Sequence, residues 1–480
     1  MLIGRKKEIK TLEKVYQSSN AEFIVLYGRR RIGKTFLIRA FFNQQDCLFF
    51  QSTGLQNGAL KKQLLHFAEA ISQLFTHGVQ IKTPSSWEEA FRTLNQFIEN
   101  QVNNKKVVVF MDEIPWMATA KSGFLEALDY YWNHYWSAKT NFILVVCGSS
   151  ASWLIKNIIY NKGGLHNRCT CEMKLAPFSL EETHLYLTHR TIHLSKSHVL
   201  ELYMALGGIP YYLNYVEKSL SAAENIQNIF FARNAPLRDE FQKLFNSLFH
   251  EASNYIELIK LIAKKKEGMS RAEIESLSKL SPGGGRLTDR LNNLVQTHFI
   301  DVYIPWEKQR GEYFKVIDEF CLFYIYWLFS NKSKQLPEHY WLKQIEKPIY
   351  HVWAGYAFEA ICYKHTNHIV QALNIKTAEN IASWRLVTRK KEQKGAQIDL
   401  LIDRSDDAIT LCEIKYTDKI FIIDKSYAEA LKSKIKVFKE HTHTNKHIFL
   451  AIISANGLKQ NDYSKELVSN VVTLDDFFHS

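Results

Sequence analysis

The chain has 480 residues, 46% of them hydrophobic and 23% charged, a composition that excludes a disordered or fibrous protein. Its length exceeds what one hydrophobic core usually serves, so about three domains are expected, and its net charge of +12 indicates a partner that carries phosphates. The seven cysteines include no CxxC pair, and no apolar run suits a signal peptide or a membrane span. We therefore expect a cytoplasmic protein with no membrane partner.

A glycine-rich loop follows the first predicted strand. The apolar run EFIVLY at residues 22–27 is followed by GRRRIGKT at 28–35 and then by a helix-like segment. In such a loop backbone N–H groups wrap phosphates, the lysine reaches the β and γ phosphates, and the threonine hydroxyl binds magnesium. The sequence thus predicts a site for ATP and Mg²⁺ that consists of Gly28, Arg29, Arg30, Arg31, Ile32, Gly33, Lys34 and Thr35.

Two acidic residues stand at the end of a further predicted buried strand. After a predicted strand at 47–51 and room for two helices, the run at 107–111 leads into Asp112 and Glu113. Acids at the carboxyl edge of a parallel strand face the ligand. We expect Asp112 to hold magnesium through water and Glu113 to orient and deprotonate the attacking water, which predicts hydrolysis as well as binding.

Two further polar positions are candidates for the same site. The strand at 142–147 precedes Gly148-Ser149-Ser150, where either serine can sense the γ-phosphate or cap the next helix. Arg168 is a candidate arginine finger or phosphate sensor, with an ordinary surface charge as the alternative.

The middle of the chain is predicted to be mostly helical. Residues 176–245 contain the helix break GGIP at 207–210 and suit a lid over the nucleotide, or simply a turn. Residues 254–317 follow the order of a winged helix-turn-helix, with two strands as the wing. Arg286, Arg290 and Asn293 are candidates for a DNA groove, although such modules also serve as protein adaptors.

A second group of acids lies near the C-terminus. Asp399 is in the strand GAQIDLLID at 395–403, and Glu413 and Lys415 share one face of the next strand. The two acids suit Mg²⁺ or Mn²⁺ and the lysine suits water activation, so the pattern predicts metal-assisted phosphodiester cleavage. Glu359, on a predicted helix, is a further candidate metal ligand, and a solvated strand face with a salt bridge is the alternative.

Together these motifs resemble the archaeal-type family of P-loop ATPases, found also in bacteria, that end in a domain related to PD-(D/E)XK nucleases. The resemblance rests on GRRRIGKT, Asp112-Glu113, CGSSASW at 147–153, GGIPYYL at 207–213, GAQIDLLIDR and CEIKY. It implies relation to AAA+ and signal-transducing ATPases, a nucleotide-driven switch and possible oligomerisation. Ile398 stands where the nuclease name has proline, and Gln397 is a further possible ligand.

The expected fold is therefore α/β, with a P-loop core at 1–175, a helical lid at 176–245, a winged helix and connecting helix at 250–330, and a nuclease-like domain at 340–480. We expect an ATPase coupled to a DNA nuclease-like domain, in DNA processing or genome defence. The alternative is a nucleotide-controlled binding switch with a silent C-terminal domain, which assembles with itself or with a protein partner.

Overall fold

The computed structural model describes residues 2–101, 105–160, 163–165, 167–278, 284–306, 311–331, 336–386 and 395–478. The chain divides into two compact units, Met1–Pro177 and Phe178–Ser480. Among the described helices, none has both the length and the apolar composition that crossing a membrane requires.

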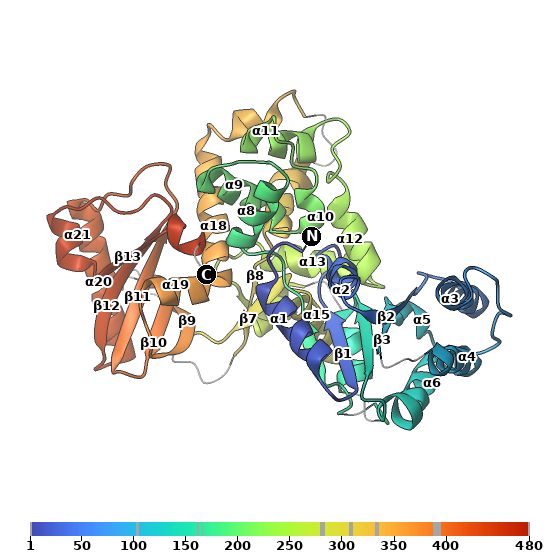
Figure 1. Ribbon diagram of the computed structural model, residues 1–480. Helices are drawn as coiled ribbons and strands as arrows, with labels where there is room; N and C mark the ends of the chain where they lie inside the picture. The colour runs from blue at the N-terminus through green and yellow to red at the C-terminus, as the bar shows by residue number, and fades with distance from the viewer. Residues whose placement is uncertain are drawn as a thin grey trace. The chain divides into compact units, whose positions relative to one another are not determined.

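The first unit is built around a five-stranded parallel sheet with the order β2-β3-β4-β1-β5 (Figure 1). Its strands are β1 (Glu22–Tyr27), β2 (Cys47–Thr53), β3 (Lys106–Asp112), β4 (Phe142–Gly148) and β5 (Cys171–Lys174). β4 lies between β1 and β3, so the strand before the phosphate loop and the strand that carries the acids are not neighbours. The predicted α/β fold with a parallel sheet is confirmed for this unit.

Helices cover both faces of this sheet, which explains why its strands read as continuous apolar runs. One face packs against α3, α4 and α6, and the other carries Phe49, on which Phe42 of α2 stacks with ring centroids 5.9 Å apart. The helices of the unit are α1 (Lys6–Gln17), α2 (Lys34–Phe42), α3 (Leu60–Phe75), α4 (Trp87–Gln101), α5 (Ile114–Met117), α6 (Phe124–Tyr131), α7 (Ala151–Leu154), and the π-helical η1 (Trp132–Trp136) and η2 (Ile155–Ile159).

The second unit begins with a helical segment, as expected from the sequence. Its helices are α8 (Leu180–His189), α9 (Lys196–Leu206), α10 (Pro210–Leu213), α11 (Ala222–Ile226), η3 (Gln227–Phe231) and α12 (Glu240–Leu248). Gly207 ends α9 with a left-handed φ of 68°, and Pro210 starts α10, so the GGIP sequence is a helix break.

A helical and three-stranded segment follows. Its elements are α13 (Ala252–Ile262), β6 (Met269–Ser270), α14 (Arg271–Leu277), α15 (Gly284–Gln296), β7 (Ile300–Tyr303) and β8 (Tyr313–Val316), and the strand order is β6-β8-β7. The connecting helix expected within 250–330 appears as α16 (Glu319–Phe323), η4 (Tyr324–Leu328) and η5 (Phe329–Asn331).

The C-terminal segment contains a second sheet with the order β13-β12-β11-β10-β9, antiparallel from β9 to β11 and parallel from β11 to β13. Its strands are β9 (Ala378–Leu386), β10 (Ala396–Arg404), β11 (Ala408–Lys415), β12 (His447–Ser454) and β13 (Asn470–Thr473). Its helices are α17 (Tyr340–Gln344), α18 (Pro348–Lys364), α19 (Thr366–Ala372), α20 (Lys425–Thr442), α21 (Asp462–Leu467) and η6 (Leu474–Phe478).

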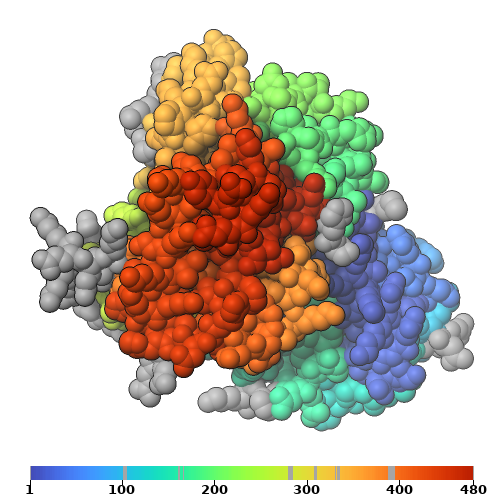
Figure 2. All heavy atoms as spheres, turned by 90° about the vertical axis from the view of Figure 1, so that its left-hand side faces the viewer, coloured from blue at the N-terminus to red at the C-terminus, as the bar shows by residue number. Residues whose placement is uncertain are grey.

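This C-terminal sheet has a helix on one face and an irregularity in β10. α20 packs on the sheet through Leu431 and Phe438, while α18 lies against β11. In Figure 2 the orange and red atoms of this part of the chain form one continuous surface. The pairing of β10 with β9 shifts register between Ile398 and Leu401, and this bulge is where Asp399 lies. Bulges of this kind redirect a side chain.

Candidate functional site

The loop between β1 and α2 has a backbone that glycine alone accommodates at two positions. Gly28 has φ +149° and Gly33 has φ +91°, and a Cβ at Gly28 would lie 2.4 Å from the carbonyl oxygen of Leu175. The buried ammonium of Lys34 donates hydrogen bonds to the carbonyls of Gly28 (2.9 Å) and Arg29 (3.0 Å). The lysine is thus held inside the curve of its own loop.

A residue that the sequence reasoning missed supports this loop from outside. Arg5 is buried, and its guanidinium donates to the carbonyls of Ile32 (3.1 Å) and Ala176 (2.6 Å). It therefore ties the loop to the segment after β5. Arg5 has a left-handed φ of 59° and precedes α1, but no local spacing in the sequence indicates these contacts.

The predicted magnesium ligands lie together. The Thr35 hydroxyl, in the first turn of α2, donates to a carboxylate oxygen of Asp112 at 2.6 Å. Asp112 is buried at the end of β3, and its other oxygen accepts from the backbone N–H of Glu113 at 3.0 Å. Hydroxyl and carboxylate oxygens beside a lysine are the donor set that Mg²⁺ and a triphosphate require, so these residues fit that pair of ligands.

Glu113 is fixed by the residue that follows β4. Its carboxylate accepts hydrogen bonds from both the backbone N–H and the hydroxyl of Ser149, each at 3.0 Å. Burial raises the pKa of Glu113, while the positive charge of Lys34 acts in the opposite direction. Ser150, the alternative, is the N-cap residue of α7 but makes no side-chain capping bond. Of the two serines, Ser149 is therefore the one placed beside Glu113.

Arg168 is exposed on the segment before β5. Its backbone N–H donates to the carbonyl of Leu165 at 3.2 Å, and its guanidinium has no ion-pair partner within the described part of the chain. The structure does not connect Arg168 with Lys34 or Glu113. Its role as an arginine finger stays a prediction.

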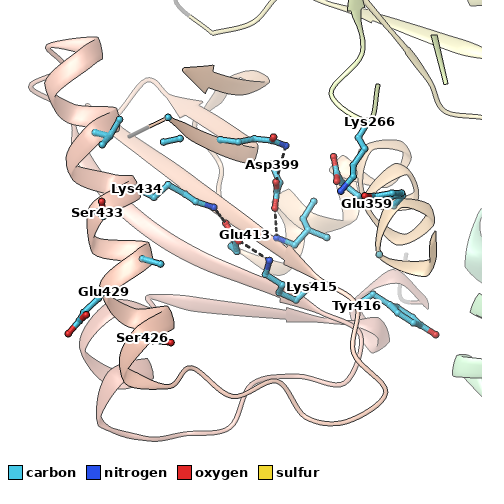
Figure 3. Close-up of a pocket in the computed structure, with 18 residues that line it drawn as sticks. Lys266, Glu359, Asp399, Glu413, Lys415, Tyr416, Ser426, Glu429, Ser433 and Lys434 are labelled. Carbon is cyan, nitrogen blue, oxygen red and sulfur yellow. Dashed lines mark hydrogen bonds and ion pairs between the residues drawn. The ribbon is translucent and has the colours of Figure 1, made fainter. Parts of the chain in front are cut away.

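The C-terminal acids line a pocket of about 800 Å³ (Figure 3). The pocket is formed by side chains of β10, β11, α18, α20 and the loop after α13. The charged residues that line it are Lys266, Glu359, Asp399, Glu413, Glu429, Lys415 and Lys434. The three residues predicted from strand spacing, Asp399, Glu413 and Lys415, therefore share one cavity.

Glu413 is buried and neutralised by two lysines. Its carboxylate pairs with Lys434 at 2.5 Å and with Lys415 at 3.0 Å, and it also accepts from the Tyr427 hydroxyl at 2.7 Å. Burial opposes ionisation, but the two lysines outweigh it and hold the pKa of Glu413 below its usual value. Glu413 is thus an ionised, well-oriented carboxylate.

Asp399 behaves in the opposite way. Its carboxylate accepts from the backbone N–H of Ile414 at 3.2 Å, and Tyr363 donates to its carbonyl. Burial, with the nearby charges of Glu413 and Glu359, raises the pKa of Asp399 to about 7. Two carboxyl groups with pKa values pushed apart in one pocket are typical of functional sites.

Glu359 lies in the same pocket but already has a partner. Its carboxylate forms an ion pair with Lys315 of β8 at 2.8 Å, and both side chains are nearly buried. Within the described residues, no three His, Cys, Asp or Glu side chains are grouped closely enough to hold a metal ion. The fit for a metal is therefore partial: Asp399 and Glu413 have suitable oxygens, whereas Glu359 is committed to Lys315.

Several pocket residues escaped the sequence reasoning. Tyr427 and Lys434 both reach Glu413 from α20, and their spacing of seven places them on one face of that helix. That spacing is the signal that could have found them. Lys266, from the loop after α13, lines the pocket, and Lys315 of β8 pairs with its lining residue Glu359. No local pattern links either segment to the C-terminal strands.

Two of the three residues expected to face a DNA groove are occupied by contacts within the fold. Arg290 pairs with Glu251 at 2.5 Å with only 11% of its side chain exposed, and Asn293 donates to the Tyr255 hydroxyl at 2.7 Å. Both therefore face their own domain because α15 packs towards α13. Arg286 is exposed on the same helix.

Comparison with known proteins defines the class of the N-terminal part. Residues 2–216 match a family described as "ATPase domain predominantly from Archaea". The chain therefore carries an archaeal-type P-loop ATPase domain, and this match covers the phosphate loop, Asp112 and Glu113.

Individual proteins and solved structures match different shares of the chain. An uncharacterized protein of Methanocaldococcus jannaschii is 23% identical in an alignment of 432 positions that covers 87% of this chain and 88% of that protein. An uncharacterized ATP-binding protein of the same organism is 44% identical over 45 residues, 9% of this chain and 76% of that protein. Among solved structures, the Walker-type ATPase of Pyrococcus abyssi has a TM-score of 0.46 at 18% identity and covers 67% of this chain and 95% of its own. The ORC2 protein of Aeropyrum pernix has a TM-score of 0.46 at 13% identity, with 66% and 91% covered.

Proposed function

We propose that this protein binds and hydrolyses ATP at its phosphate loop and cleaves DNA at a metal-dependent site in its C-terminal pocket. The observation that carries the ATPase half is the joint placement of Asp112 against Thr35 and of Glu113 against Ser149. Asp112 is hydrogen-bonded to the hydroxyl that would bind the metal ion, whereas Glu113 is hydrogen-bonded to Ser149 instead. Hydrolysis requires this division between a residue that holds the metal and a residue that activates water.

At the first site each residue has a defined part. The loop N–H groups and Lys34 would bind the phosphates, and Thr35 with Asp112 would hold Mg²⁺, which supplies neutralisation of phosphate charge when bound. Glu113 orients and deprotonates the attacking water, and its raised pKa brings it closer to the pH at which a general base works best. Ser149 keeps the carboxylate pointed at that water and senses the γ-phosphate.

At the second site the acids and the lysines also have different roles. Asp399 and Glu413 would hold Mg²⁺ or Mn²⁺, which supplies Lewis-acid activation of the phosphodiester when bound. Lys415, 3.0 Å from Glu413, positions water and offsets phosphate charge. Lys434 and Tyr427 fix the carboxylate of Glu413 on the side of α20.

The segments between the two sites suit coupling them. We assign residues 176–245 to a lid and 250–330 to a winged helix, supported by the order of α13, α14, α15 and the β7–β8 hairpin. Residues 340–480 form the nuclease-like domain. The net charge of +12 suits DNA as the partner, and assembly into an oligomer or with a protein partner belongs to the same proposal.

A second candidate function is a nucleotide-controlled binding switch with a silent C-terminal pocket. The ion pairs of Glu413 with Lys434 and of Glu359 with Lys315 favour it, because both carboxylates are already neutralised by lysines. In that case the pocket binds a phosphate-bearing partner without cleaving it.

Steady-state ATP hydrolysis with Mg²⁺ tests the first half. Lys34→Ala should lose nucleotide binding, and Glu113→Gln should still bind ATP but hydrolyse it at least about a hundredfold more slowly. Glu88→Gln, which removes an exposed charge of the same unit, is the matched control and should keep full turnover. Wild-type turnover in both site variants would refute the ATPase assignment.

DNA cleavage with Mg²⁺ or Mn²⁺ tests the second half. Lys415→Ala should abolish cleavage and leave ATP hydrolysis unchanged, whereas Asp406→Asn, at an exposed position beyond the pocket, should leave both unchanged. Undiminished cleavage by Lys415→Ala would remove this pocket as the nuclease site.

A further inference from the structure

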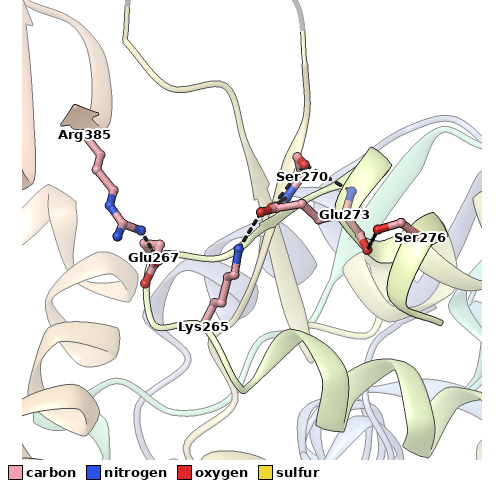
Figure 4. A network of polar contacts seen from close by, with 6 residues as sticks. All are labelled: Lys265, Glu267, Ser270, Glu273, Ser276 and Arg385. Atoms are coloured by element: carbon pink, nitrogen blue, oxygen red, sulfur yellow. Dashed lines mark hydrogen bonds and ion pairs between the residues drawn. The ribbon is translucent and has the colours of Figure 1, made fainter. Parts of the chain in front are cut away.

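Lys265, Lys266 and Glu267 are the last three of four consecutive charged residues in the loop that leads from α13 to β6, and the outer two of these three form ion pairs. Lys265 forms an ion pair with Glu273 of α14, and Glu267 forms one with Arg385 of β9 (Figure 4). The hydroxyl of Tyr303 also donates to the carbonyl of Glu267. The backbone on both sides of residue 266 is therefore fixed to neighbouring elements.

The middle residue of the three points into the C-terminal pocket. The ammonium of Lys266 lies 3.3 Å from the ring centroid of Tyr356, and the side chain lines the same cavity as Asp399 and Glu413. Figure 3 shows it extending from its loop towards Glu359. Within the described part of the chain, Lys266 has no ion pair and no hydrogen bond.

This situation differs from that of the other pocket lysines. Lys415 and Lys434, the other lysines that line the pocket, both pair with Glu413, and Lys315 beside the pocket pairs with Glu359, so each of these ammonium groups already has a carboxylate partner. An ammonium has three N–H donors, and a ring face satisfies at most part of this capacity. Lys266 thus brings a positioned cation with unused donors into a pocket that holds the proposed reaction centre.

A neighbouring hollow suggests the form of the ligand. A second cavity of about 730 Å³ shares Glu359 and Gln397 with the pocket and is lined by the partly exposed rings of Tyr303, Trp306 and Tyr313. Aromatic rings beside a lysine with unused donors are features that suit single-stranded nucleic acid, because bases stack on the rings while the cation contacts a phosphate.

We propose that Lys266 is a phosphate-binding residue of this pocket, supplied by the loop between α13 and β6, and that it contacts the backbone of a single-stranded DNA segment beside the acids. The inference rests on the proposed nuclease function and names the form of its substrate. The ion pairs of Lys265 and Glu267 position it.

The test is binding of a short fluorescein-labelled single-stranded oligonucleotide to the full chain, followed by anisotropy over a series of salt concentrations in EDTA. Lys266→Ala should weaken binding about tenfold and reduce the salt slope by about 0.7, the value for one phosphate contact on a single strand. Lys264 is an exposed residue of the same loop and does not line the pocket. Lys264→Ala should therefore change the affinity and the salt slope less than Lys266→Ala does. Lys266→Arg should restore the slope.

Equal affinity and equal slope for the Lys266→Ala and Lys264→Ala proteins would overturn the inference, and so would absence of oligonucleotide binding by the wild type. Cleavage by the same proteins with Mn²⁺ separates the two proposals. Binding without cleavage would refute the nuclease function, while the comparison of slopes would still support or overturn the role of Lys266.

Discussion

A buried histidine makes the second unit sensitive to acid. His365 has 4% of its surface exposed, and its Nε2 atom accepts a hydrogen bond from the backbone N–H of Leu180 at 3.3 Å. Its Nδ1 atom lies 2.9 Å from the carbonyl of Ile361 and therefore carries the ring proton. Protonation of Nε2 would place its N–H against the N–H of Leu180, so that two donors face each other. Burial lowers the pKa of His365 from 6.5 to about 3.

The size of the effect follows from linkage. Because the pKa is lowered in the folded state, the unfolded chain takes up the proton first, and stability is lost as the pH falls from about 6.5 towards 3. At pH 5 the loss relative to pH 8 is about 2 kcal/mol, a value set mainly by the unfolded pKa. At pH 8 this contribution is fully present.

Urea unfolding at pH 5 and pH 8 measures the contribution of His365 to the free energy of unfolding. His365→Gln keeps an oxygen that can accept from Leu180 but does not titrate, so the part of the pH dependence due to this site, about 2 kcal/mol, should disappear. His189→Gln, an exposed histidine of α8, is the control and should unfold with the wild-type pH dependence. An unchanged pH dependence in His365→Gln would refute the reasoning.

Three further outcomes are expected. Gly28→Ala should reduce stability and nucleotide binding more than Gly33→Ala, because both have positive φ but only Gly28 lacks room for a Cβ; thermal unfolding and ATP binding check this, and equal losses would contradict it. Ser149→Ala should lower ATP turnover about tenfold without weakening ATP binding, because Glu113 loses a hydroxyl donor; unaltered turnover would speak against it. Metal affinity of the C-terminal pocket, measured by calorimetry, should weaken below about pH 7 because Asp399 becomes protonated, and pH-independent affinity would exclude Asp399 as a ligand.

Local patterns were sufficient to predict that the candidate residues of the first site lie near one another. Thr35 lies just after the loop that follows β1, while Asp112 and Glu113 lie at the end of β3. Because parallel strands present their carboxyl ends at one edge, these residues could be expected near one another. The choice between Ser149 and Ser150 required coordinates, since both follow β4 within one turn.

The second site was predictable only in part. Alternation along β11 placed Glu413 and Lys415 on one face, but the bulge in β10 that orients Asp399 has no signature in the sequence. Glu359 was expected to be a third metal ligand. The structure pairs it with Lys315, which lies far away in the chain, and no local pattern in the sequence predicts that ion pair.

The periodicity of the sequence could not predict the burial of Arg290 either. The spacing of α15 identifies its apolar face, but not that its polar edge meets Glu251 and Tyr255 of the preceding segment. Which charged residues of a helix remain available for DNA depends on such tertiary pairs.

The central claim is that one chain joins an ATPase to a metal-dependent nuclease, and DNA cleavage by the full chain tests it most directly. Linear, nicked and single-stranded DNA would be incubated with Mg²⁺ or Mn²⁺, with and without ATP, using the wild type, Asp399→Ala and Glu113→Gln. We predict metal-dependent cleavage by the wild type that is absent in Asp399→Ala and altered in its response to ATP in Glu113→Gln. Intact DNA under every condition, together with robust ATP hydrolysis, would contradict this account and favour the nucleotide-controlled binding switch.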